Sequence, residues 1–256
     1  MPDFRAFAVS VAQRAGDLLL RRHGDTLALE YTLRTNFKTS VDDESDKLIR
    51  HAINEAFPTH NIHSEEGPND LNGSEFSWVI DPLDGTLPYT YGISDHFGVC
   101  IALIRGRTPI LGVVYAPQRN ELYVAEEGKG SFCNDRMIKV ATIEDINRSL
   151  IGLDYGKHNR SQILRYQAAL LGEAGVTYTV SYACTSVSLA LVASGKLHGY
   201  VAMELEPWDM AAGVVILREA GAVVTSAAGK DWGIEDVSII AANHHIHKNL
   251  LRLLRC

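Results

Sequence analysis

Acidic residues beside glycines recur at three places in this sequence, in patterns that suit the binding of a divalent cation. The first, WVIDPLDGT at residues 78–86, puts Asp81 and Asp84 three positions apart at the end of an apolar run. Two carboxylates this close raise each other's pKa unless a positive charge lies between them. Mg²⁺ prefers oxygen ligands and commonly uses a few carboxylates. The motif therefore favours a metal site at a strand end, although Asp-Pro and Asp-Gly turns also occur without one.

The other two clusters also combine acids with glycine. HSEEG at 63–67 places Glu65 and Glu66 shortly before the apolar run, and EPWDMAAG at 206–213 places Asp209 at the start of an apolar helical pattern. An acid at a helix start is by itself usually a cap. Three such clusters, each at the end of an element, together favour one shared site over three unrelated turns.

The first half of the chain is expected to supply two helices and a meander. Apolar residues at helical spacing predict a helix over 4–19 and another over 48–56. The acid-rich run at 41–46 is expected to precede the second helix, where acids suit the positive end of the helix dipole. Short β-branched and aromatic runs then predict an antiparallel meander with strands at 78–82, 97–104, 109–117 and 121–127, turns at 105–109 and 117–121, and an edge at 128–135.

The second half alternates between strands and helices. We expect strands at 149–156, 176–182, 198–203, 222–226 and 238–243, and helices at 160–174, 185–195, 208–221 and 245–254. Alternation of this kind predicts stacked sheets covered by helices, an α/β class in the wide sense that includes α+β. We expect a single domain over residues 1–256, with a soft division into two lobes near 140–150.

The composition excludes several classes of protein. The chain has 256 residues, of which 46% are hydrophobic and 21% charged, as in an ordinary soluble globule. A net charge of −7 with no basic block argues against a nucleic-acid partner. No apolar run reaches membrane-spanning length, and the start MPDFRAFAVSVAQRAG lacks the pattern of a signal peptide. The four cysteines show no CxxC spacing, which indicates free thiols in a reducing compartment, so we expect a cytoplasmic protein.

Together, SEEG at 64–67, WVIDPLDGT at 78–86 and EPWDMAAGVVILREAGAVVT at 206–225 resemble the motifs of the inositol monophosphatase family. The resemblance runs over nearly the whole chain. It implies the layered αβαβα sugar-phosphatase fold, usually as a homodimer, and a Mg²⁺-dependent, lithium-sensitive hydrolase of small phosphomonoesters. It also implies that metal-activated water attacks phosphorus directly, with no phosphoenzyme.

The resemblance implies roles for individual residues as well. Asp42 and Thr86 would orient and help to deprotonate the attacking water, and Glu66 would support the metals from outside the ligand set. The phosphate would accept hydrogen bonds from the backbone of Gly85 and Thr86. Two or three Mg²⁺ ions would be held by Glu65, Asp81, the carbonyl of Leu83, Asp84 and Asp209. Glu65 would also take part in catalysis. For the rest of the substrate we expect contacts with Thr185, Glu204 and Lys157. Thr185 stands in the segment that borders the substrate in the family. Glu204 is either a substrate-binding acid or a surface acid, and Lys157 lies in DYGKHNR at 154–160, which either meets a second anionic group or is a solvated basic loop.

Four departures from the family pattern bear on the substrate. Val41 stands where threonine is common, and Pro88-Tyr89 where Asn-Phe is usual. ACTS at 183–186 replaces a small Gly-Ser/Thr-Ala segment, with Cys184 interpreted as a small packing residue. Ala202 stands where the animal enzymes have an acid that grips sugar hydroxyls, and Glu204 and Glu206 lie close enough in the sequence to substitute for it.

The substrate stays open at this point. Inositol-1-phosphate leads by resemblance alone, and histidinol phosphate, fructose 1,6-bisphosphate and adenosine 3′,5′-bisphosphate would use the same chemistry. The ammonium of histidinol phosphate would require a facing carboxylate such as Glu204 or Glu206. A catalytically silent, metal-binding relative that acts as a regulator is the alternative from another class.

Overall fold

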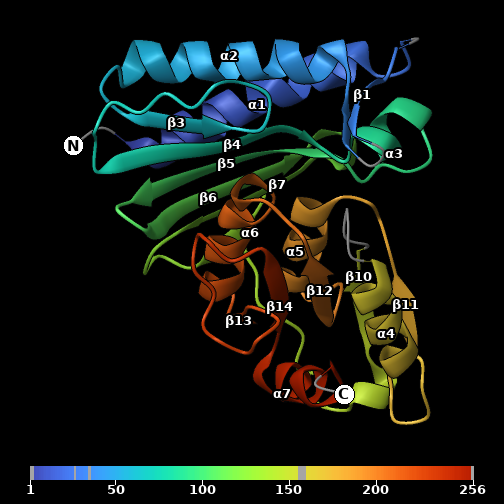
Figure 1. The fold of residues 1–256 in the computed structure, drawn as a ribbon. Coiled ribbons are helices and arrows are strands. Elements are labelled where there is room, and N and C mark those ends of the chain that lie inside the picture. The colour runs from blue at the N-terminus through green and yellow to red at the C-terminus, as the bar shows by residue number, and fades with distance from the viewer. Residues whose placement is uncertain (1–2, 26, 34–35, 155–159, 255–256) are drawn as a thin grey trace.

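The computed structural model describes residues 3–25, 27–33, 36–154 and 160–254, and these form five layers (Figure 1). Helices α1 (Phe4–Arg22) and α2 (Ser40–Ala56) cover the outer face of a seven-stranded sheet. Helices α5 (Thr185–Ala193) and α6 (Pro207–Glu219) lie between this sheet and a five-stranded one. Helices α4 (Arg160–Leu170) and α7 (His244–Leu254) cover the far face of the second sheet. The predicted layered αβαβα fold is therefore confirmed.

The seven-stranded sheet contains the predicted meander. Its order is β3-β4-β5-β6-β7-β8-β9, antiparallel throughout except that β3 runs parallel to β4. The predicted turns and edge are in place, with Gly106 and Asn120 in left-handed conformations at the two turns. The strands are β3 (Asn61–Ser64), β4 (Phe76–Asp84), β5 (Gly98–Arg105), β6 (Thr108–Ala116), β7 (Glu121–Glu126), β8 (Ser131–Cys133) and β9 (Arg136–Met137), with a 3₁₀ turn η1 (Pro117–Arg119) before β7.

The five-stranded sheet is mixed and contains the strands that the alternating pattern predicts. Its order is β11-β10-β12-β14-β13, with β10 parallel to both of its neighbours and β14 antiparallel to both of its own. A 3₁₀ turn η2 (Ile146–Arg148) leads into it. The strands are β10 (Leu150–Leu153), β11 (Tyr178–Val180), β12 (Gly199–Met203), β13 (Val223–Thr225) and β14 (Ser238–Ala242).

Several details differ from the sequence predictions, which also included no strand at β3 (Asn61–Ser64). The acid-rich run at 41–46 lies inside α2 rather than before it, because Thr39 caps the helix and Ser40 begins it. The helix expected over 160–174 ends at Leu170, where the N–H of Val176 donates to the Leu170 carbonyl at 2.7 Å. A short hairpin of β1 (Glu30–Leu33) and β2 (Asn36–Lys38) precedes α2 and had no clear signal in the sequence.

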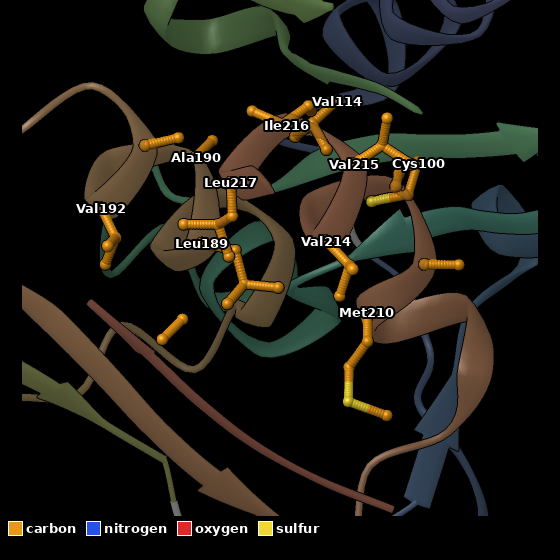
Figure 2. Close-up of a cluster of buried hydrophobic side chains, with 14 of the residues drawn as sticks. Cys100, Val114, Leu189, Ala190, Val192, Met210, Val214, Val215, Ile216 and Leu217 are labelled. Carbon is orange, nitrogen blue, oxygen red and sulfur yellow. The ribbon is translucent and has the colours of Figure 1, made fainter. Parts of the chain in front are cut away.

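The core between the two sheets is built around α5 and α6, and Figure 2 shows some of its buried side chains, among them Leu189, Val214 and Leu217. The helices approach the first sheet closely, since a Cβ on Gly112 of β6 would lie 2.2 Å from the Ala212 carbonyl of α6. Val214 and Leu217 of α6 are fully buried here, and burying such a side chain contributes roughly 1.5–3 kcal/mol. This core includes residues of both sheets. The division into two lobes near 140–150 stays a prediction.

Among the described residues, no helix combines the length and the apolar character that crossing a bilayer requires.

A partly exposed ion-pair network ties the first sheet to the end of α5. Glu121 of β7 accepts hydrogen bonds from Arg119 at 3.1 Å, from Tyr123 at 2.7 Å and from Lys196. Burial alone would raise the pKa of Glu121, but these donors outweigh it and lower the pKa to about 2. The network therefore stabilises the fold at neutral pH and weakens as the carboxylate is protonated.

We expect Glu121→Gln to lower the free energy of unfolding by about 1 kcal/mol at pH 7, since solvent screens much of an ion pair near the surface. The loss should shrink as the pH falls from about 4.5 toward 2, because the stabilisation from a depressed pKa disappears over that range. Urea unfolding at several pH values measures it. Glu235→Gln is the control, because its partner Arg107 is 70% exposed; an equal loss of stability there would contradict the stabilising role of Glu121.

Candidate active site

A bulge near the end of β4 turns Asp81 and Asp84 toward the same side of the sheet. In a regular strand, residues three apart point to opposite faces. Here Asp81 pairs with Cys100 and Asp84 with Gly98, so three steps along β4 match two along β5. The extra residue falls next to Pro82, which has no N–H to donate to the ladder. Both carboxylates therefore face the layer of α5 and α6.

Asp81 is the most buried carboxylate of the group, with 1% of its surface exposed. Its Oδ1 accepts the N–H of Leu83 at 3.0 Å. Burial raises the pKa of Asp81 well above its usual range, and the charges of Glu65, Asp84 and Asp209 raise it further. An ionised Asp81 is therefore unfavourable unless a positive charge joins it.

Glu65, Asp81 and Asp209 each bring one carboxylate oxygen to within 4.8 Å of the other two. Glu65 follows β3, and its N–H donates to the Ile80 carbonyl at 3.2 Å, which fixes it beside the end of β4. The parallel pairing of β3 with β4 is thus what brings HSEEG next to WVIDPLDGT. Three acids from separate parts of the sequence meet, as the sequence predicted for a shared site.

Asp209 reaches the cluster from the start of α6. It is the third residue of the helix and forms a capping box with Glu206, whose N–H donates to Asp209 Oδ2 at 2.8 Å. The close approach of α6 to β6 at Gly112 sets how near this end of the helix lies to the first sheet. Asp209 is therefore both a cap and a member of the acidic cluster.

Asp84 is held from the opposite side by the start of α5. Its Oδ2 accepts the N–H of Ser186 at 2.6 Å and lies 3.2 Å from the Cys184 thiol. Burial raises the pKa of Asp84, while the bonds from Ser186 and Cys184 lower it. Cys184 is buried, as expected of a packing residue, but its sulfur also contacts a proposed metal ligand.

Asp42 and Thr86 lie together beneath the end of β4. Asp42 Oδ2 accepts the N–H of Thr39 at 2.8 Å and its hydroxyl at 2.6 Å. Thr86 Oγ1 lies 3.2 Å from Asp42 Oδ1 and 3.2 Å from the Leu83 carbonyl. Burial raises the pKa of Asp42, and its hydrogen bonds counter part of that rise. The structure thus pairs the acid and hydroxyl that the resemblance links.

The backbone after Asp84 turns sharply into a short helix, α3 (Thr86–Tyr91). Gly85 has φ +85°, and a Cβ there would lie 2.7 Å from the His96 carbonyl, so no other residue fits without strain. Pro88 and Tyr89 are buried, and the Tyr89 hydroxyl donates to the Leu19 carbonyl at 2.8 Å. This departure from the family pattern therefore fixes α3 against α1.

Glu66 pairs with Lys38 of the β2 strand and is not among the three converging acids. Its Oε2 lies 3.5 Å from Lys38 Nζ, and its side chain is 9% exposed. Burial, reinforced by the charge of Asp42, raises the pKa of Glu66 to about 7 despite the lysine. The charge of Glu66 therefore borders the site without joining the three converging acids.

The residues proposed for the rest of the substrate are spread more widely. Thr185 is buried at the start of α5, and Ala202 lies in the core between the sheets. Glu204 follows β12 with φ +58°, and the exposed Glu206 caps α6. Lys157 lies outside the described residues.

Several residues of the site were missed by the sequence analysis. Thr39 and Ser186 hold Asp42 and Asp84, and Lys38 faces Glu66. Thr39 had a detectable signal, because a threonine three residues before an acid can form a capping box. Ser186 had none, since it acts through its backbone N–H from 102 residues away.

The donor set fits a hard divalent cation. The carboxylate oxygens converge and repel one another, which raises the pKa of Asp81. A bound cation would supply the positive charge that offsets this repulsion. Mg²⁺ takes such oxygens, whereas Zn²⁺ usually takes nitrogen or sulfur as well.

Comparison with known proteins agrees with the motifs. Residues 2–256 match the model of the inositol monophosphatase family. The chain belongs to that family. A putative Nus factor SuhB of Neisseria meningitidis serogroup B is 34% identical, covering 99% of this chain and 98% of its own. An inositol-1-monophosphatase of Rhizobium meliloti is 34% identical, covering 96% and 94%.

A solved structure carries the same fold. The Thermotoga maritima IMPase superimposes with a TM-score of 0.89 at 28% identity, covering 99% of this chain and 97% of that one. Membership of the family confirms the resemblance read from the three motifs, and it supports phosphatase chemistry on small phosphorylated molecules.

We expect Asp81→Asn to raise the melting temperature of the metal-free protein, because it removes a buried charge that three acids repel. In a chain of this size the rise should be roughly 2–4 °C for each kcal/mol of repulsion relieved. The wild-type protein in EDTA should also lose stability as the pH rises above about 4, since the folded state binds this proton more tightly than the unfolded chain does.

The same variant should lose the stabilisation that Mg²⁺ gives to the wild-type protein. Differential scanning calorimetry in EDTA and in Mg²⁺ measures both effects. A variant that is less stable without metal, or still stabilised by Mg²⁺ as much as the wild type, would contradict the role given to Asp81.

Proposed function

We propose that this protein is a Mg²⁺-dependent hydrolase of a small phosphomonoester, with inositol-1-phosphate as the leading substrate. The observation that carries the proposal is the convergence of Glu65, Asp81 and Asp209 beside the Asp42–Thr86 pair. Membership of the inositol monophosphatase family supports it, as does the name of the Rhizobium relative.

In this proposal two or three ions are held by carboxylates and one carbonyl. When bound, such cations neutralise a phosphate dianion, acidify water and stabilise the leaving alkoxide. The protein's part is to hold its ligands in place, which the backbone N–H bonds to Asp81 and Asp84 do. The proposed ligands are Glu65, Asp81, the Leu83 carbonyl, Asp84 and Asp209, with Glu66 beyond them.

The Asp42–Thr86 pair would handle the proton of the attacking water. Thr86 Oγ1 would accept it while passing its own hydrogen to Asp42 Oδ1, 3.2 Å away. Because burial raises the pKa of Asp42, its carboxylate is a better proton acceptor than an ordinary aspartate. Thr39 keeps the other oxygen occupied, so the proton goes to one atom.

Substrate binding is assigned to the turn after β4 and the start of α5. Gly85 and Thr86 would present N–H groups to the phosphate, and Thr185 would border the leaving group. Glu204 remains a candidate for contacting an ammonium or hydroxyl, whereas the Glu206 carboxyl accepts the Asp209 N–H in the capping box. Lys157 keeps its proposed role only as a prediction from the sequence.

A second candidate is a regulator that binds metal without turnover, and the name of the Neisseria relative, a putative Nus factor, favours keeping it. The intact acidic set argues for turnover, because a regulator has no need of the Asp42–Thr86 pair in addition to the metal ligands. The two functions can coexist in one protein, and the activity measurements below separate them.

We expect phosphate release from one monoester of a panel, fast with Mg²⁺, absent in EDTA and inhibited by lithium. The panel is inositol-1-phosphate, histidinol phosphate, fructose 1,6-bisphosphate and adenosine 3′,5′-bisphosphate. A colorimetric phosphate assay measures it. Stabilisation by Mg²⁺ without release from any of the four would contradict the hydrolase proposal for these substrates and favour the regulator.

Two variants separate the proposed roles. Asp84→Asn should abolish turnover by weakening metal binding, while Asp42→Asn should lower kcat by roughly 10²–10⁴ but keep the stabilisation by Mg²⁺, because it removes only the proton acceptor. Steady-state rates and calorimetry with Mg²⁺ measure both. Glu235→Gln, far from the cluster on the surface, is the control. An active Asp84→Asn enzyme would overturn the metal assignment.

A further inference from the structure

A strained residue lies beside the segment that holds Asp84. Ala183 has φ +53°, a left-handed conformation that is uncommon for residues other than glycine, asparagine and aspartate. Strain of this kind persists only where the surroundings over-determine it. The residues two before and two after it, Ser181 and Thr185, both contact the same buried pair of side chains, Asp154 and Tyr200.

Asp154 and Tyr200 form this pair beneath the segment. Asp154 follows β10 and is 9% exposed, and Tyr200 lies in β12 with no exposed surface. The Tyr200 hydroxyl donates to Asp154 Oδ2 at 2.5 Å and lies 3.2 Å from Thr185 Oγ1. The other carboxylate oxygen, Oδ1, accepts the hydroxyl of Ser181. The pair therefore fixes the chain on both sides of Ala183.

The segment so fixed is the one that contacts Asp84. Cys184 and Ser186, which flank Thr185, are the groups whose thiol and N–H meet Asp84 Oδ2. A shift of Thr185 would move both donors together, since α5 begins at this residue. The start of α5 therefore links Asp84 to the pair of Asp154 and Tyr200.

We propose that Asp154 and Tyr200 are positioning residues for Asp84: they hold residues 181–186 in the conformation that orients this carboxylate for the cation. The inference deepens the proposed function and rests on Asp84 being a metal ligand. In this role both act through the backbone and thiol of the segment between them. The charge of Asp154 also raises the pKa of Asp84 directly; Tyr200→Phe leaves that charge in place, and Asp154→Asn and Asp154→Ala both remove it.

Tyr200→Phe tests the proposal, because it removes one hydroxyl and keeps the buried ring. Tyr182, whose ring stacks on His96 with centroids 3.8 Å apart, still holds the segment in the variant, so the fold should survive. The matched control is Tyr123→Phe, which removes another buried tyrosine hydroxyl with a carboxylate partner, Glu121, in a different part of the protein.

We expect Tyr200→Phe to raise the Mg²⁺ concentration for half-maximal thermal stabilisation by roughly tenfold, as when other groups that orient metal ligands are lost. Tyr123→Phe should lower the metal-free melting temperature to a similar degree but leave the Mg²⁺ midpoint within about twofold of the wild type. Glycine at position 183 removes the backbone strain. In an Ala183→Gly background, the shift in the Mg²⁺ midpoint caused by Tyr200→Phe should therefore fall by at least about half.

The Mg²⁺ concentration for half-maximal thermal stabilisation is measured without turnover. It therefore tests this inference even if no phosphate is released from any monoester. In an active enzyme, the Mg²⁺ concentration for half-maximal activity should shift in parallel. An unchanged Mg²⁺ midpoint in Tyr200→Phe, or an equal shift in Tyr123→Phe, would overturn the proposal. Asp154→Asn, which keeps an acceptor for Tyr200, should show a smaller shift than Asp154→Ala; equal shifts would also contradict it.

Discussion

The repulsion among buried carboxylates at one end of the seven-stranded sheet is the constraint on which the rest of this site depends. Asp81 is almost fully buried, and Glu65, Asp84 and Asp209 all push its pKa upward. A fold that gathers these charges loses stability unless a cation joins them. The bulge in β4, the parallel pairing of β3 and the close approach of α6 at Gly112 serve to bring the acids together.

Backbone N–H groups hold each aspartate of the site through one oxygen. Asp42, Asp81, Asp84 and Asp209 accept from Thr39, Leu83, Ser186 and Glu206 respectively. Two of these bonds belong to capping boxes, so the starts of α2 and α6 define the two sides of the site. Such bonds orient a carboxylate and offset part of its charge, which lets the cluster form before metal binds.

Much of this could be predicted from the sequence, for identifiable reasons. The meander, the layers and the meeting of the three acidic clusters followed from periodicity and from glycine-flanked acids at element ends, and the motifs indicated the family. The bulge at Pro82–Leu83 and the role of Ser186 could not be predicted, because register and backbone donors carry no side-chain signature. The apolar spacing did not indicate that the acid-rich run at 41–46 lies inside α2, because the start of this helix depends on the cap at Thr39. The contact between Cys184 and Asp84 depends on packing between distant segments.

We expect the converging oxygens of Glu65, Asp81 and Asp209 to bind a divalent cation. A crystal grown with Mn²⁺ in place of Mg²⁺, with data collected at the manganese absorption edge, tests this claim most directly. The expected result is an anomalous peak within about 2.0–2.4 Å of oxygens from all three residues. No peak at this place at millimolar Mn²⁺, or a peak bound by other residues only, would contradict it.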